Sequence, residues 1–230
     1  MKKGNINLVF HKLVNNYNEI SNRYDFVFDH AVKVVREVKE KSMQYPGLKT
    51  VVFLDDGYVS QYAFSKRIIE SLDINVHISL IAEKIGHEEY LSENNIHDLK
   101  SCGVDFCAHG FSHAALGKYY NDKVLTTKSG GVYRNLPRGH KNILTRNEVK
   151  FQVCESTTKL EKFGLHINSF VYPYGIYNNE IMKIVQESGL YEYAYTCDDD
   201  IEMGSSQPFA LPRFMVYNDV SILDRIFRNH

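Results

Sequence analysis

Short apolar segments alternate with longer amphipathic segments along almost the whole chain, and this alternation limits the possible folds most strongly. Apolar runs of about four to eight residues favour buried strands, whereas apolar residues spaced three and four apart favour helices that cover a sheet. Their alternation indicates βα units around a parallel sheet or barrel. The seven predicted strands are Asn7–His11, Thr50–Leu54, Asn75–Ile81, Asp105–Ala108, Ser169–Tyr172, Tyr193–Thr196 and Phe209–Val216.

Four amphipathic segments between these strands are predicted to be helices. Gly164 and Gly189 each follow one of them, at the position where glycine commonly ends a helix. Seven strands are too many for a small sheet and one fewer than a regular eight-stranded barrel has. The predicted helices are Phe26–Lys41, Gln61–Leu72, Arg146–Phe163 and Asn179–Ser188.

The composition is that of one folded domain, with 230 residues of which 43% are hydrophobic and 24% charged. The sequence contains no internal repeat, low-complexity tract or linker, so residues 1–230 are expected to form a single domain. One segment, at about 117–143, is rich in glycine, tyrosine and basic residues and lacks sustained periodicity. A connection of that length is either a functional lid or a disordered excursion, and both interpretations stay open.

The charge balance argues against polyanionic partners. Lys and Arg number 27 against 28 Asp and Glu, a net charge of −1, so no strong field attracts nucleic acid or an anionic membrane. The sequence has no apolar span of about 18 residues, and the run Leu8–Phe10 is too short for a signal peptide. The chain as given is therefore expected to be cytoplasmic, or exported and envelope-associated if a signal has been removed from it.

Two adjacent carboxylates, Asp55 and Asp56, follow the strand Thr50–Leu54 and precede Gly57. At a strand end before a glycine turn, both side chains can reach the same rim. Active sites of βα proteins are built at the carboxyl ends of strands, so the pair is a candidate catalytic or metal-binding group. In the alternative interpretation, Asp56 caps the next helix and Asp55 is solvated.

Two histidines, His109 and His113, lie four residues apart at the end of the strand Asp105–Ala108. This spacing lets two imidazoles bind one ion, although such pairs are also common by chance. One Asp oxygen and two His nitrogens would make three protein ligands, the open set typical of a catalytic metal site. These ligands favour Zn²⁺, and Ni²⁺, Co²⁺ or Fe²⁺ would also fit them.

A third motif, Pro173-Tyr174-Gly175, follows the strand Ser169–Tyr172. A backbone N–H freed by such a turn can donate to a developing oxyanion beside a metal. On spacing alone, a turn that merely ends the strand is the simpler interpretation.

The order of these motifs, Asp-Asp-Gly, His-x-x-x-His and Pro-Tyr-Gly, each at a strand end, resembles the polysaccharide deacetylase family, the NodB-homology carbohydrate esterases. The resemblance covers about Val51 to Val216. It implies an α/β fold with an incomplete, seven-stranded, distorted (β/α) barrel, and it implies hydrolysis of N-acetyl groups. Carried over by position, it implies that Asp55 is the general base, that Asp56, His109 and His113 hold a divalent metal, and that the Tyr174 N–H helps form the oxyanion hole.

The chain departs from the family pattern at Val171, where many members have an arginine that pairs with the catalytic carboxylate. The last motif, which usually contains a histidine general acid, here reads Leu211-Pro212-Arg213. We hypothesise that Arg213 supplies the positive charge missing at Val171. The pattern is more similar to the branch that acts on bacterial surface glycans, including poly-N-acetylglucosamine deacetylases.

Some acid must replace the absent histidine, because amide hydrolysis requires protonation of the leaving nitrogen. His11 is the first candidate, since it ends the first strand and should face the same rim as Asp55. His140, in the long segment, is the second. Two alternatives stay open: His11 is a structural histidine, or Asp55 returns its own proton.

These observations predict a metal-dependent hydrolase that removes N-acetyl groups from a bacterial carbohydrate, either a surface or capsule-type polysaccharide or its precursor. One alternative keeps the metal chemistry but acts on another amide or ester, because the motifs describe the reaction centre and not the sugar pocket. Another is a catalytically weak, glycan-binding relative. A pure binding protein has no need for a base beside an open metal site, so Asp55 separates these alternatives.

Overall fold

The computed structural model describes residues 3–117, 119–120, 123–124, 144–204 and 206–227. Seven parallel strands form one curled sheet, an incomplete barrel, and this confirms the predicted fold class. A short antiparallel strand, β11 (Glu202–Met203), also pairs with β1. In spatial order the parallel strands are β12 (Phe214–Met215), β1 (Gly4–Phe10), β4 (Leu48–Asp56), β5 (Asn75–Leu80), β6 (Asp105–Ala108), β9 (Ser169–Val171) and β10 (Tyr193–Tyr195).

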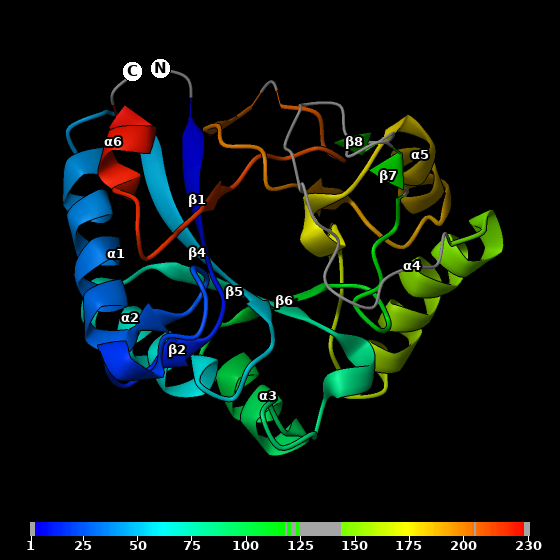
Figure 1. The fold of residues 1–230 in the computed structure, drawn as a ribbon, viewed down its shortest axis with the longest axis horizontal. Coiled ribbons are helices and arrows are strands. Elements are labelled where there is room, and N and C mark those ends of the chain that lie inside the picture. Colours follow the sequence, from blue (N-terminus) through cyan, green and yellow to red (C-terminus); the bar gives the residue numbers. More distant parts are fainter. Residues whose placement is uncertain (1–2, 118, 121–122, 125–143, 205, 228–230) are drawn as a thin grey trace.

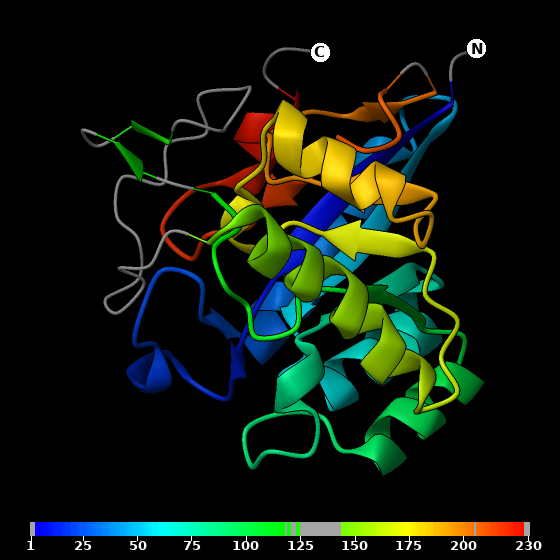
Figure 2. The ribbon, with the colours of Figure 1, turned by 90° about the vertical axis from the view of Figure 1, so that its right-hand side faces the viewer.

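Helices surround the outside of this sheet, with α1 and α2 on one side and α4 and α5 on the other (Figure 1). The three helices predicted to begin at Gln61, Arg146 and Asn179 start at those residues, and the one predicted from Phe26 starts two residues later. In the view turned by 90°, α4 and α5 pack against the side of the sheet (Figure 2). The helices are α1 (Phe28–Ser42), α2 (Gln61–Leu72), α3 (Glu93–Ser101), α4 (Arg146–Glu161), α5 (Asn179–Glu187) and α6 (Ile222–Phe227).

Two pairs of short strands lie outside the main sheet. The pair β2 (Leu13–Val14) and β3 (Phe26–Val27) is parallel, and β7 (Tyr119–Tyr120) and β8 (Lys123–Val124) are antiparallel. Most of the long segment predicted at about 117–143 lies outside the described residues, so its two interpretations stay predictions. The 3₁₀ turns are η1 (Tyr17–Glu19), η2 (Ala82–Lys84) and η3 (Pro173–Gly175).

The alternation of side chains across β4 explains how the barrel buries two apolar layers and a carboxylate. Val52 and Leu54 belong to the large core cluster, which fills the space between the sheet and the helices. Val51 and Phe53 point the other way, into a smaller cluster inside the barrel. Asp55 continues this inner row because strand side chains repeat every two residues, and it is 2% exposed.

The last part of the barrel differs from the prediction, because only Phe214–Met215 of the expected strand Phe209–Val216 lies in the sheet. Leu211 exchanges two backbone hydrogen bonds with the end of β10, at 2.8 and 2.9 Å, whereas Phe214–Met215 pairs with β1. Pro212 stands at the change of partner, and proline has no N–H to donate to a ladder. The segment thereby connects the two edges of the curled sheet, with the Arg213 side chain fully buried.

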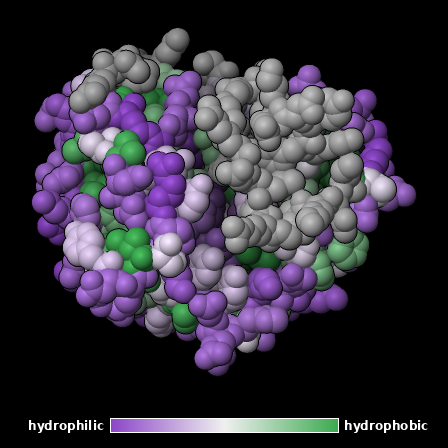
Figure 3. Space-filling view, in the orientation of Figure 1, coloured by the Kyte–Doolittle hydropathy of each residue, from purple (hydrophilic) through white to green (hydrophobic). Residues whose placement is uncertain are grey.

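The described residues contain no helix that is both long and apolar enough to span a membrane. One face of the molecule is mostly hydrophilic and carries only small, separate apolar patches among its coloured residues (Figure 3). The large apolar side chains instead fill the two clusters described above.

Candidate active site

The carboxyl ends of parallel strands bring the predicted site residues to one rim of the barrel. His11 follows β1, Asp55 and Asp56 end β4, and His109 follows β6. Tyr174 lies in η3, immediately after β9. This is the end of a βα barrel at which active sites are found.

The turn after β4 requires glycine. Asp56 and Gly57 both have positive φ angles, of 77° and 80°. A Cβ atom on Gly57 would lie 2.8 Å from Cδ2 of Leu80, on the neighbouring strand β5. A non-glycine residue such as Asp56 is strained in this conformation, and such strain is concentrated at functional sites.

Asp56, His109 and His113 present their ligand atoms to one another. Oδ1 of Asp56 lies 3.6 Å from Nε2 of His109 and 3.4 Å from Nε2 of His113. The two Nε2 atoms are 3.2 Å apart. One ligand atom from each residue thus lies within 4.8 Å of the others, a group that could hold a metal ion.

The environment of His109 suits a metal ligand. Nδ1 of its ring is 2.9 Å from the carbonyl oxygen of Val171, which fixes the ring orientation and leaves Nε2 facing the other two residues. Burial lowers the pKa of His109 to about 4, despite the opposing charge of Asp55. The imidazole is therefore neutral near pH 7, as metal ligation requires.

Asp56 also fits a bound cation. Its carboxylate is buried, and among the described residues Oδ1 has no hydrogen-bond partner. Burial raises the pKa of Asp56 above its usual range, because His11 and His109 supply too little positive charge to offset desolvation. A divalent cation would provide that charge, so the three residues present fit a metal.

His113 is held by the turn that connects it to His109. Gly110 and His113 have φ angles of 73° and 58°, which reverse the chain between the two histidines. Gln152, a buried residue of α4, contacts the middle of this turn twice. Its Oε1 accepts from the Ser112 N–H at 2.9 Å, and its Nε2 donates to the Ser112 hydroxyl at 2.9 Å.

Asp55 forms a buried, bidentate ion pair with Arg213. Nη1 of Arg213 donates to Oδ1 at 2.9 Å and Nη2 donates to Oδ2 at 3.0 Å. The Ser79 hydroxyl adds a third hydrogen bond to Oδ1 at 2.8 Å. Burial alone would raise the pKa of Asp55, but the charge of Arg213 and its hydrogen bonds hold it well below its usual range. Asp55 is therefore ionised near pH 7.

Arg213 is positioned by further contacts. Its side chain is 0% exposed, its Nε donates to the Thr196 carbonyl oxygen at 2.9 Å, and Nη2 lies 3.7 Å from Sγ of Cys197. Its guanidinium also lies over the Phe53 ring, 5.0 Å from the centroid. Val171, the position of the arginine in many relatives, instead packs in the apolar cluster inside the barrel.

His11 and Tyr174 complete the rim. Burial acts to raise the pKa values of both Asp55 and Asp56. His11 lies close enough for a positive charge on its ring to lower both values and so to favour the ionised carboxylates, although this effect is smaller than that of burial. Its ring packs against Tyr24, with centroids 5.3 Å apart. Tyr174 has a φ angle of 58°, and its ring lies 4.3 Å from that of His113. His140 lies outside the described residues.

Three supporting residues were not predicted from the sequence. They are Ser79, which bonds Asp55, Gln152, which holds the His109–His113 turn, and Gln61, which bonds backbone carbonyls beside the site. Ser79 lies in a predicted strand, and each glutamine lies in a predicted helix. The signal in the sequence for each of these residues was a polar side chain at a position where the predicted strand or helix would bury it.

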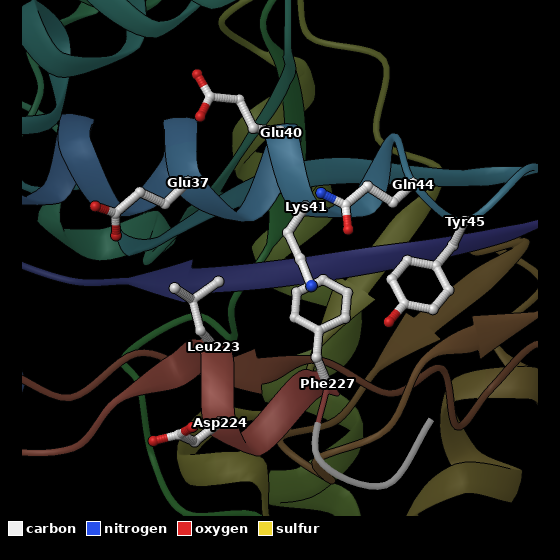
Figure 4. A pocket seen from close by; sticks show the side chains of 8 residues that line it. All are labelled: Glu37, Glu40, Lys41, Gln44, Tyr45, Leu223, Asp224 and Phe227. Carbon is white, nitrogen blue, oxygen red and sulfur yellow. The ribbon is translucent and has the colours of Figure 1, made fainter.

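The described residues also form a cavity away from the rim. A groove of about 500 Å³ lies between α1 and α6, with Glu37, Lys41, Tyr45 and Phe227 in its lining (Figure 4). Tyr45 and Phe227 stack there with ring centroids 5.4 Å apart. The groove contains none of the predicted site residues, so it is separate from the candidate active site.

The sequence model of the polysaccharide deacetylase family matches residues 43–193, and the chain belongs to this family. YxkH of Bacillus subtilis (strain 168), whose name carries the same family designation, is 21% identical over 167 residues. That match covers 72% of this chain and 50% of YxkH, so the chain spans about half the length of this curated relative.

Solved structures of deacetylases share the fold. The Streptococcus pyogenes deacetylase PplD, solved in complex with acetate, has a TM-score of 0.73 at 15% identity, with 96% of each chain covered. IcaB from Ammonifex degensii has a TM-score of 0.69 at 18% identity, covering 94% of this chain and 93% of its own. A polysaccharide deacetylase from Bacillus cereus has a TM-score of 0.71 at 14% identity, covering 96% of this chain and 67% of its own.

The geometry predicts that His109→Ala weakens binding of a divalent metal by roughly 100-fold or more, because one of three ligands is lost. Titration of metal-free protein with Zn²⁺ would measure the change. His97→Ala is the matched control, since His97 lies on α3 with its side chain 50% exposed and should leave the affinity unchanged. Equal Zn²⁺ affinity in wild type and His109→Ala would contradict the assignment of the site.

Proposed function

We propose that the protein is a metal-dependent N-deacetylase of a bacterial carbohydrate, a surface or capsule-type polysaccharide or its precursor. The observation that carries the proposal is the buried ion pair of Asp55 with Arg213, directly beside the Asp56–His109–His113 group. Family membership supports a carbohydrate substrate. The ligand set favours Zn²⁺ as the metal.

The proposed mechanism assigns a role to each residue at the rim. Asp56, His109 and His113 would hold the metal, which as a Lewis acid lowers the pKa of water and polarises a carbonyl oxygen. Asp55 accepts the proton of the attacking water, and Arg213 keeps that carboxylate ionised and oriented.

The remaining steps involve η3 and β1. The Tyr174 N–H donates to the oxyanion that develops on the acetamide oxygen. His11 donates a proton to the departing amine nitrogen, because it follows β1 beside the end of β4 that carries Asp55. The amide C–N bond breaks, acetate is released, and the sugar keeps a free amine.

The Arg213–Asp55 pair favours an enzyme over a catalytically weak glycan-binding relative. The sequence lacks the arginine expected at Val171, yet a buried arginine reaches the same carboxylate from the other edge of the barrel. Burying an ion pair costs desolvation free energy, and a binding site for neutral sugars has no need of one.

The first test is acetate release from N-acetylglucosamine oligomers by protein loaded with Zn²⁺. Asp55→Asn keeps the shape of the side chain but removes the base, so kcat should fall by roughly 100-fold or more. Zn²⁺ content should stay near that of wild type, because Asp55 is not a predicted ligand. Absence of acetate release from wild type on all glycan probes, with Zn²⁺ bound, would contradict the proposed function.

Arg213→Met should lower both activity and stability, because it leaves Asp55 buried without its partner. We expect kcat to fall by about 100-fold and the free energy of unfolding by about 3–5 kcal/mol. The double variant Asp55→Asn/Arg213→Met removes both charges, so urea titration should show it to be more stable than Arg213→Met alone. High activity in Arg213→Met would remove the proposed role of the arginine.

His11→Gln tests the assignment of the general acid. The substitution keeps a polar side chain but cannot supply a proton, so kcat should fall by roughly 100-fold while Zn²⁺ affinity stays unchanged. His30→Gln, on the outer helix α1, is the control and should keep full activity. Wild-type kcat in His11→Gln would favour the alternative in which Asp55 returns its own proton.

A further inference from the structure

Gln61, the first residue of α2, connects two strands through its side chain. It is 0% exposed, and its Nε2 donates to the backbone carbonyl oxygen of Asp55 at 2.5 Å and to that of His11 at 3.0 Å. Both protons of the amide are used. Because both partners are carbonyl oxygens, only the nitrogen end of the amide can face them.

The residue that makes this bridge is itself held in place. The Gln61 N–H donates to the Tyr58 carbonyl oxygen at 3.0 Å, and the Gln61 carbonyl accepts from the Ser65 hydroxyl at 2.8 Å. The neighbouring Ser60 hydroxyl accepts from the Leu13 N–H at 3.1 Å. The start of α2 is therefore fastened to the ends of β1 and β4.

The bridge lies where the pairing of β1 with β4 stops. The backbone pairing of β1 with β4 ends at Phe10 and Leu54, one residue before His11 and Asp55. The sheet ladder thus does not hold these two residues to each other. The amide of Gln61 takes over that role, immediately before the strained turn that begins with Asp56.

The two bridged carbonyls belong to the residues assigned above as acid and base. The side chains of His11 and Asp55 project from the same backbone units that Gln61 holds, so a shift of either strand end would move the proton donor relative to the proton acceptor. Displacements of about 1 Å at a catalytic centre are enough to cost about 100-fold in rate.

We propose that Gln61 is a positioning residue that sets the separation of His11 and Asp55 for the deacetylation, by extending the β1–β4 connection one residue beyond the sheet. This inference rests on the proposed function. It concerns a side chain that touches neither substrate nor metal, and it assigns a specific role to a buried amide at the start of α2.

Gln61→Met is the test, because methionine has a similar length and volume but no donor. We expect kcat for acetate release from N-acetylglucosamine oligomers to fall by roughly 10- to 100-fold, with KM within about twofold of wild type. Zn²⁺ affinity should not change, because Gln61 contacts none of the three ligand side chains. Gln61→Asn keeps the amide on a shorter side chain and should also lower kcat, and it carries the test if Gln61→Met does not fold.

Tyr191→Phe is the matched control for the loss of a buried polar contact. Its hydroxyl lies 2.6 Å from both the Val153 carbonyl and the Thr157 hydroxyl, outside the candidate active site, so its removal should lower Tm but leave kcat unchanged. Wild-type kcat in both Gln61 variants, with Tm lowered as in Tyr191→Phe, would overturn the proposal in favour of a purely structural role. A wild-type protein that releases no acetate would contradict the proposed function itself.

Discussion

The ion pair between Asp55 and Arg213 is the interaction on which the inside of the barrel depends. Two charges at 2% and 0% exposure are stable there only because each satisfies the other, with two hydrogen bonds between them and further bonds from Ser79 and to the Thr196 carbonyl. The pair requires the segment around Pro212 to cross from β10 to β1. The closure of the barrel and the charge of the candidate base therefore both depend on the contact between Asp55 and Arg213.

Backbone strain is concentrated at the same rim. Among the described residues, the non-glycine residues with positive φ are Asp56, Asp73, His113 and Tyr174. Asp73 ends α2, where a left-handed residue is ordinary, but the other three are candidate site residues. Asp56 ends β4, and His113 and Tyr174 lie in the turns that follow β6 and β9. The structure holds these turns with buried side-chain bridges, such as that of Gln152 to Ser112.

Much of the fold could be predicted because the pattern of apolar residues is strong. The helix Gln61–Leu72 and the strand Asp105–Ala108 have the predicted bounds, since both are bordered by clear turn residues. The strand expected at Phe209–Val216 was too long, because its apolar residues pair with two different strands in turn. Apolar pattern alone does not show which neighbour a short segment will meet.

The candidate site was likewise predicted only in part from the sequence. The Asp55–Asp56 and His109–His113 motifs are short in sequence, so their order and spacing indicated a candidate metal site. The hypothesis that Arg213 compensates for Val171 required a family pattern, and the structure places the two side chains of the expected pair in contact. Gln61 and Gln152 were not predicted, because their importance depends on distances between elements that are far apart in the chain.

The crossing segment at Leu211 to Met215 also bears on how the chain acquires its structure during synthesis. His11 emerges from the ribosome before Asp55 and the histidine pair, and Arg213 emerges after all of them. Until then, the carboxylate in the middle of the sheet lacks the cation that makes its burial favourable. Completion of the barrel thus waits for the segment Leu211 to Met215, so the candidate active site matures only after that segment has been synthesised.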